Sequence, residues 1–86
     1  MSKDVIDVKC LDGTRLELVF DGGECRSIDV ADLVGFDGVF EPLQDPDYFR
    51  QVRVVPDVGT IVWPNGADLC PDVLYERSRP VARRSA

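Results

Sequence analysis

Closely spaced turn signals are the feature that most constrains how this chain can fold. Asp12-Gly13 and Asp21-Gly22-Gly23 separate three short stretches near the amino terminus. Asp-Gly and Gly-Gly pairs accept the positive φ angles of tight hairpin turns. Short stretches bounded by such turns are typical of an antiparallel meander. The first third of the chain is therefore predicted to form three sequential strands, at residues 5–11, 15–20 and 24–29.

Alternation of apolar and polar residues supports the first two strands. The first stretch places Ile6, Val8 and Cys10 on one side, with charged residues between them. The second stretch has apolar residues at alternate positions from Leu16 to Phe20. A period of two is what a half-buried strand requires, so one face of this sheet is expected to carry the core.

The middle of the chain predicts a short helix and a second hairpin. Asp45-Pro46 is a typical helix start, with the aspartate as N-cap and the proline in the first turn, and predicts a helix over residues 46–51. The β-branched stretches 52–55 and 60–63 flank a Pro-Asp-Val-Gly turn. These stretches predict a hairpin. Residues 30–43 are expected to form a loop with single helical turns.

One small core is expected, because a chain of 86 residues is too short for two independent cores. The predicted fold class is α+β, with a small antiparallel β-sheet made of a three-stranded meander plus a second hairpin. Two short helices complete it, the second at residues 71–76. A single domain is expected over residues 1–76. Residues 77–86 offer little to bury and are expected to form a basic disordered tail.

Charge is distributed unevenly along the chain. Residues 1–76 hold all 16 acidic side chains, whereas residues 77–86 hold arginines and no acid. An acidic body repels phosphate backbones and attracts basic proteins, so nucleic acid is not expected to bind it. The tail arginines are the candidates for an accessory contact with nucleic acid: Arg77, Arg79, Arg83 and Arg84.

No catalytic or metal-binding motif is present. Cys10, Cys25 and Cys70 form no C-x-x-C pair, and the chain has no histidine. A zinc site or an activated cysteine usually needs such partners, so we expect no metal, no cofactor and no enzymatic activity. Unpaired cysteines favour the cytoplasm. Neither a signal peptide nor a membrane span is expected.

The sequence around the single tryptophan is the most distinctive part of the chain. The run from Gly59 to Pro71 follows Asp45-Pro46 and precedes Leu74-Tyr75, and the segments Phe20–Glu24 and Gly38–Phe40 complete the pattern. This pattern resembles the prokaryotic domain-of-unknown-function family 2442 (DUF2442) from the first strand to Tyr75. The resemblance implies a small α+β fold with an antiparallel sheet, and it supplies no catalytic residues.

The same resemblance bears on function. Some members of that family carry a DNA-binding helix-turn-helix domain behind this one, of which the present sequence has no counterpart. Others stand alone and are suspected partners in toxin–antitoxin-like gene pairs. The resemblance therefore favours an antitoxin-like role over direct regulation of transcription.

Two interpretations of the segment from Trp63 to Leu69 stay open. In the structural one, Trp63 fills the core, Asn65-Gly66 takes a left-handed turn, and Asp68 binds backbone amides. In the functional one, the segment is a partner-binding knob, because tryptophan is enriched among interface hot spots. The candidate partner-binding residues are Trp63, Pro64, Asn65, Gly66, Asp68 and Tyr75.

The sequence favours a non-catalytic protein-interaction or regulatory module, with an antitoxin-like role as one form of it. A basic protein partner is expected. A homodimer is a second option, because a small core gains stability from association. Two alternatives belong to other classes: a small-ligand binder or small enzyme built on Asp68 and its neighbours, and nucleic-acid contact through the arginine tail.

Overall fold

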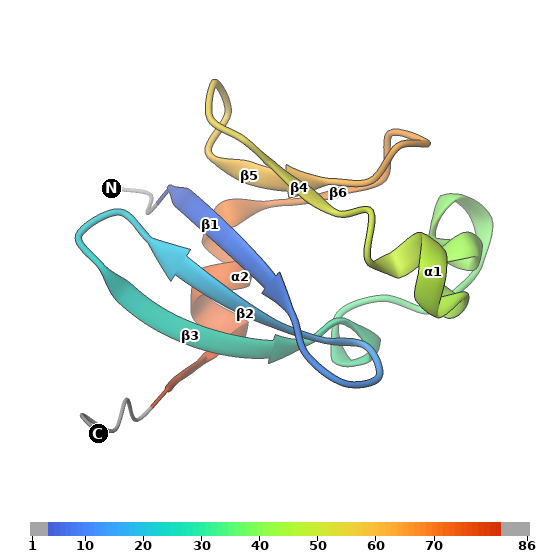
Figure 1. The fold of residues 1–86 in the computed structure, drawn as a ribbon, viewed down its shortest axis with the longest axis horizontal. Coiled ribbons are helices and arrows are strands. Elements are labelled where there is room, and N and C mark those ends of the chain that lie inside the picture. The colour runs from blue at the N-terminus through green and yellow to red at the C-terminus, as the bar shows by residue number, and fades with distance from the viewer. Residues whose placement is uncertain (1–3, 82–86) are drawn as a thin grey trace.

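The computed structural model describes residues 4–81 of the chain. It holds a four-stranded and a three-stranded antiparallel sheet, with short helices in the connection between them. Helix α2 (Pro71–Arg77) packs across one face of the larger sheet, and the smaller sheet lies beside strand β1 (Val5–Cys10) (Figure 1). This arrangement confirms the predicted α+β class with a meander and a second hairpin, and it places the meander and the hairpin in two sheets where one was predicted.

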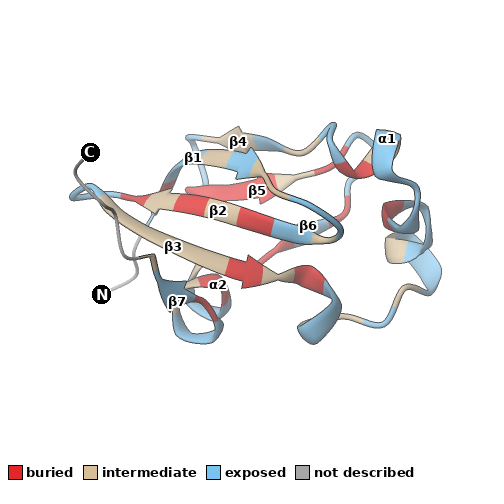
Figure 2. Ribbon diagram, turned by 60° about the horizontal axis from the view of Figure 1, so that its bottom comes forward, coloured by how far each residue is buried: buried red, intermediate tan, exposed pale blue. Residues whose placement is uncertain are grey.

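The larger sheet is built on the predicted meander. Strands β1, β2 (Arg15–Phe20) and β3 (Glu24–Asp29) pair in sequence order. The alternate residues Leu16, Leu18 and Phe20 of β2 are fully buried. Figure 2 shows this alternation of buried and partly exposed positions along β2. The predicted period of two therefore holds for this strand.

A β-bulge interrupts the alternation that was predicted for the first strand, and the prediction is wrong at its first residues. Val5 pairs with Phe20 and Asp7 pairs with Val19, so Ile6 is an extra residue with no partner in the register. Val5 takes the inward position that the alternation assigned to Ile6, and Ile6 is exposed. An inserted residue breaks the period of two locally, and alternation alone does not reveal where this happens.

Short helices occupy the connection between the two sheets. The 3-10 helices η1 (Val30–Asp32) and η2 (Gly38–Gln44) fill the region expected to be a loop with helical turns. Helix α1 (Pro46–Phe49) follows, and the Asp45 carboxylate caps it by accepting a hydrogen bond from the Asp47 amide at 3.0 Å. The predicted helix start is confirmed, and the helix ends before residue 51.

The smaller sheet contains the predicted second hairpin and one further strand. Strands β4 (Arg53–Val55) and β5 (Thr60–Val62) form the hairpin, and β6 (Asp68–Leu69) pairs with β5. A strand of two residues carries no periodic pattern, so sequence analysis does not identify β6. Its pairing with β5 makes the distinctive segment from Trp63 to Leu69 the loop and second strand of a further hairpin.

The folded domain continues past the predicted boundary at Glu76. Helix α2 includes Arg77, and β7 (Arg79–Pro80) pairs with β3. The Val81 amide then donates to the Cys25 carbonyl at 3.0 Å. Residues 77–81 therefore belong to the domain and not to the predicted tail, because pairing with a sheet edge uses backbone groups and needs no apolar side chain. The rest of that tail, residues 82–86, lies outside the described residues.

One hydrophobic cluster contains residues of both sheets, α1 and α2. Its largest fully buried side chains include Trp63 of the loop after β5, Phe20 of β2 and Leu74 of α2. None of the helices found between residues 4 and 81 is long and apolar enough to cross a membrane.

Candidate functional site

Trp63 belongs to the core. The residue is 1% exposed, and its indole N–H donates to the Phe49 carbonyl at 3.0 Å. Its ring centroid lies 5.8 Å from that of Phe49. A side chain that is buried and whose polar atom is already paired presents neither exposed surface nor a free hydrogen-bond donor to a partner. The interpretation of Trp63 as a partner-binding knob is therefore corrected in favour of the structural one.

Pro64 and Gly66 shape the loop between β5 and β6. The Gly66 amide donates to the Trp63 carbonyl at 2.9 Å, with Pro64 at the second position of this turn. Gly66 has a φ of 90°, whereas no described residue other than glycine has a positive φ. A type I turn followed by a glycine with positive φ is a common three-residue hairpin loop. The predicted left-handed conformation is thus confined to Gly66, and Asn65 does not share it.

Asn65, and not Asp68 as predicted, is the residue whose side chain accepts from a backbone amide in this segment. Its backbone amide donates to the Tyr48 hydroxyl at 2.8 Å, and its side-chain Nδ2 donates to the Val39 carbonyl at 2.9 Å. Its Oδ1 accepts from the Ala67 amide at 3.1 Å. These bonds fasten the loop to α1 and η2. Asp68 itself is exposed on β6.

Tyr75 lies apart from this loop and joins α2 to β3. Its hydroxyl donates to the Glu24 carboxylate at 2.8 Å, and its ring meets that of Phe20 edge to face at 5.0 Å. The Arg26 guanidinium lies 4.3 Å from the Tyr75 ring centroid and donates to the Ser78 carbonyl at 2.7 Å. The hydrogen bond to Glu24 raises the pKa of Tyr75 by stabilising the protonated phenol, and burial and the carboxylate charge act in the same direction.

Arg26 is a residue that sequence analysis does not single out. It lies opposite Leu18 in the register, on the inward face of β3, and its side chain is 12% exposed. It donates to the Glu24 carboxylate at 2.8 Å and to the Ser78 hydroxyl at 2.8 Å. A charged residue at an inward strand position is the available signal, because buried arginine is rare without partners. The cluster of Glu24, Arg26, Tyr75 and Ser78 fastens the end of α2 to the sheet.

An open hollow lies where β1 meets the β4–β5 hairpin. Hydrogen bonds of the backbone fix its walls: the Val5 amide donates to the Gly59 carbonyl at 2.8 Å, and the Asp21 amide donates to the Asp4 carbonyl at 2.8 Å. We call it the acid-rimmed hollow. Its volume is about 240 Å³, and it is lined by Asp4, Val5, Ile6, Asp21, Val54 and Pro56.

Gly59 permits the close approach of chain segments beside this hollow. Its φ is 69°, a conformation that side-chain-bearing residues rarely adopt. A Cβ atom at this position would collide with the Asp4 side chain. Glycine at position 59 therefore allows the chain before β1 to lie against the β4–β5 turn, which brings the Asp4 carboxylate to the rim.

The cysteines and acids form no metal cluster within residues 4–81. Cys10, Cys25 and Cys70 are free thiols. Burial raises the pKa of the Cys10 thiol, and the positive charge of Arg50 opposes that effect. Cys10 therefore stays protonated at neutral pH, which is the weakly nucleophilic form.

The predicted tail arginines divide into two groups. Arg77 ends α2 and donates to the Asp32 backbone carbonyl at 3.5 Å, and Arg79 is exposed on β7. Arg83 and Arg84 lie outside the described residues.

Comparison with protein families gives a match over most of the chain. The model of the family described as "Protein of unknown function (DUF2442)" matches residues 5–80, from β1 to the end of β7. The matched range includes β7, beyond Tyr75, where the resemblance in the sequence pattern ends. No curated protein and no solved structure matches the chain.

Proposed function

The chain belongs to the DUF2442 family, and from its surface geometry we propose that it is a non-catalytic protein-interaction module. The proposed binding site is the acid-rimmed hollow. The proposed ligand is a segment of a partner protein that carries an aliphatic residue flanked by lysine or arginine. The exposure of Ile6 in this hollow is the observation that carries the proposal.

Ile6 is 54% exposed, although its neighbour Val5 is buried. The bulge in β1 produces this exposure, and bulges often re-aim a side chain beside a functional site. Val54 and Pro56 line the same hollow, and Val58, at the tip of the same hairpin, is 62% exposed. Apolar surface that is grouped and rimmed by polar residues is typical of an interaction site, unlike single exposed aliphatic residues.

The charge around the hollow defines the partner. Asp4 and Asp21 stand at its rim, Asp57 lies next to Pro56 in the adjoining turn, and no lysine or arginine among residues 4–81 lines it. All 16 acidic residues of the chain lie within this described range, and none of them is buried. Such a surface steers positively charged segments toward it and disfavours acidic ones. An aliphatic side chain from a basic segment would cover Ile6 while its flanking cations meet the two aspartates.

An antitoxin-like role is a more specific form of this proposal. In that form, the partner is a basic protein whose activity is suppressed while the hollow is occupied. The family resemblance and the acidic surface both favour it over a purely structural partnership.

Selection of binding peptides tests the proposal even though the partner is unidentified. A random peptide library displayed on phage is panned on the folded chain at low salt. We expect the enriched peptides to carry an aliphatic residue flanked by lysine or arginine. We also expect them to lose binding to the Ile6→Asp variant, because that change adds a negative charge in place of the apolar surface.

Val39→Asp provides the matched control. Val39 is also an exposed aliphatic residue, but it lies on η2, and the substitution changes the charge equally. Enriched peptides that bind Ile6→Asp as well as the native chain, or a selection that enriches acidic or uncharged sequences, would contradict the proposed site.

A further inference from the structure

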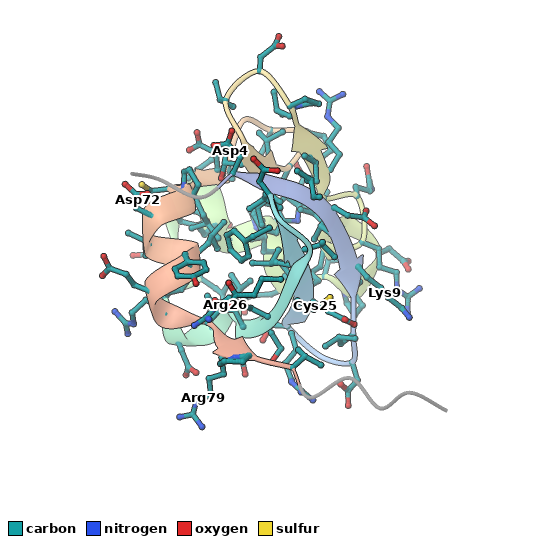
Figure 3. The ribbon with its side chains drawn as sticks, turned by 90° about the vertical axis from the view of Figure 1, so that its left-hand side faces the viewer. Asp4, Lys9, Cys25, Arg26, Asp72 and Arg79 are labelled. Atoms are coloured by element: carbon teal, nitrogen blue, oxygen red, sulfur yellow. The ribbon has the colours of Figure 1, made fainter. Side chains whose placement is uncertain are left out.

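Basic residues gather in a second hollow near the end of α2. Figure 3 shows Asp4 and Asp72 at the beginning of α2, whereas Arg79 lies beyond its opposite end. We call this second site the arginine hollow. Its volume is about 210 Å³, and it is lined by Arg15, Ser27, Ile28, Asp29, Asp32, Arg77 and Arg79.

The fold, and not the sequence, brings these arginines together. Arg15 begins β2, Arg77 ends α2, and Arg79 belongs to β7. Pairing of β7 with β3 places Arg79 opposite Ser27, which also lines the hollow. Residues 4–81 contain seven basic residues, so three of the seven line one small depression in an otherwise acidic surface.

The two carboxylates of the arginine hollow leave this positive charge only partly offset. Asp29 accepts hydrogen bonds from the Thr14 hydroxyl at 2.6 Å and from the Ala31 amide at 3.0 Å, so it serves as a helix cap. Arg77 donates to the backbone carbonyl of Asp32 and not to its carboxylate. A backbone carbonyl carries no net charge. Among residues 4–81, these two acids therefore do not form ion pairs with the arginines that line the hollow.

The guanidinium groups are available to a ligand. Arg15 has an ion pair with Asp12 at 3.3 Å, in which the side chains are 52% and 88% exposed. Exposed pairs of this kind are weak, so a ligand can replace Asp12. Within residues 4–81, the Arg79 guanidinium has no hydrogen-bond or ion-pair partner.

We infer that the arginine hollow binds a short acidic segment of a partner protein. Guanidinium groups match carboxylates with paired, charge-assisted hydrogen bonds, and three of them can hold neighbouring carboxylates of one segment. A short segment touches only the hollow, whereas a long polyanion such as nucleic acid would extend over the surrounding acidic surface and be repelled. The chain would thus present two surfaces of opposite preference at the two ends of α2. This inference does not depend on the acid-rimmed hollow.

Nuclear magnetic resonance of the isotope-labelled full chain tests the inference. The probe is a short peptide of alternating glutamate and aspartate with blocked ends, added at low salt. We expect shifts of the backbone amides of β3 and β7 that line the hollow. The double variant Arg15→Glu/Arg79→Glu should weaken binding by at least about tenfold.

A control of equal charge makes the result specific. Arg50→Glu/Arg53→Glu produces the same change in net charge at exposed positions of other elements, and it should keep the affinity of the native chain within about twofold. If the Arg15/Arg79 variant fails to fold, Arg79→Gln gives the same test with a smaller loss. Arg79 pairs with β3 through its backbone, so this change leaves the strand in place.

Two results would overturn the inference. One is equal weakening by the two double variants, which would mean that the peptide responds only to net charge. The other is stronger binding of a single-stranded thymidine oligonucleotide at the same amides, which would assign the hollow to phosphate.

Discussion

The loop between β5 and β6 and the strand β1 contribute to the domain in opposite ways. The loop has the most distinctive sequence of the chain, and its hydrogen bonds and Trp63 are directed into the molecule. Strand β1 has an ordinary alternating sequence, yet its bulge directs Ile6 to the surface. A distinctive motif can therefore mark packing, and a common pattern can hold a binding surface, because the sequence of a tight loop is restricted by geometry whatever its function.

The strongest test of this contrast is Trp63→Ala. Truncating a fully buried tryptophan is expected to cost about 3–5 kcal/mol of unfolding free energy. That loss is comparable with the roughly 3–5 kcal/mol that one small core supplies, so the variant should be largely unfolded by circular dichroism. Trp63→Phe, which keeps most of the packing and loses the bond to Phe49, should fold. A stable, folded Trp63→Ala variant would make Trp63 a candidate for partner binding again.

The sequence predicts an element correctly where its local residue pattern agrees with the environment of those residues in the folded domain. Alternation in β2, the Asp45 cap of α1 and the paired turns of the meander are all predictable, because each depends on residues close together in the chain. The bulge at Ile6 is not predictable in this way, because the period of two contains no information about where it is interrupted.

The candidate sites are less accessible to sequence reasoning than the fold. The acid-rimmed hollow combines residues of β1, β4 and the turn after β2, and the arginine hollow combines β2, β3, η1, α2 and β7. Long-range contacts create both surfaces, and no short motif encodes them. Strand β7 shows the same effect, since local composition alone assigns its arginine to a tail.

The next prediction concerns Gly59, where the β4–β5 turn touches strand β1. Gly59→Ala must place a side chain at a φ of 69° and displace the Asp4 side chain. Gly22→Ala is the matched control, because its φ of 102° is also positive but nothing lies near an added Cβ. Each substitution is expected to cost about 1–2 kcal/mol from backbone strain, with an additional loss only at Gly59. Urea denaturation measures both, and equal losses would show that Asp4 does not lie against the turn.

Asn65→Ala tests whether the loop is held by its hydrogen bonds. The change removes the side-chain bonds to the Val39 carbonyl and the Ala67 amide and keeps the backbone bond to Tyr48. The expected cost is about 1–2 kcal/mol by urea denaturation. Asp68→Ala, at the exposed residue of the same segment, should cost less than about 0.5 kcal/mol. A larger loss of unfolding free energy for Asp68→Ala than for Asn65→Ala would show that Asp68 is the residue that stabilises this segment.

Glu24→Gln tests the cluster that joins α2 to β3. The Glu24 carboxylate raises the pKa of Tyr75, so the neutral glutamine should lower that pKa toward its ordinary value. In the native chain the protonated phenol favours the folded state, so its contribution is present below the unfolded pKa and is lost as the pH rises through the folded pKa. Ultraviolet absorbance of tyrosinate follows the titration. Glu41→Gln, on η2, removes the same charge and should leave the midpoint where it is in the native chain.

The smallest effect on stability is expected at Ile6, and it tests the bulge directly. Ile6→Thr keeps a β-branched side chain at an exposed position, so the unfolding free energy should change by less than about 0.5 kcal/mol. Val5→Thr places a hydroxyl in the core and should cost about 1–3 kcal/mol. Without the bulge, the alternation of β1 would reverse this order, because Ile6 would then point inward and Val5 outward. The order of the two losses in urea denaturation therefore decides whether Ile6 belongs to the core or is available to a partner.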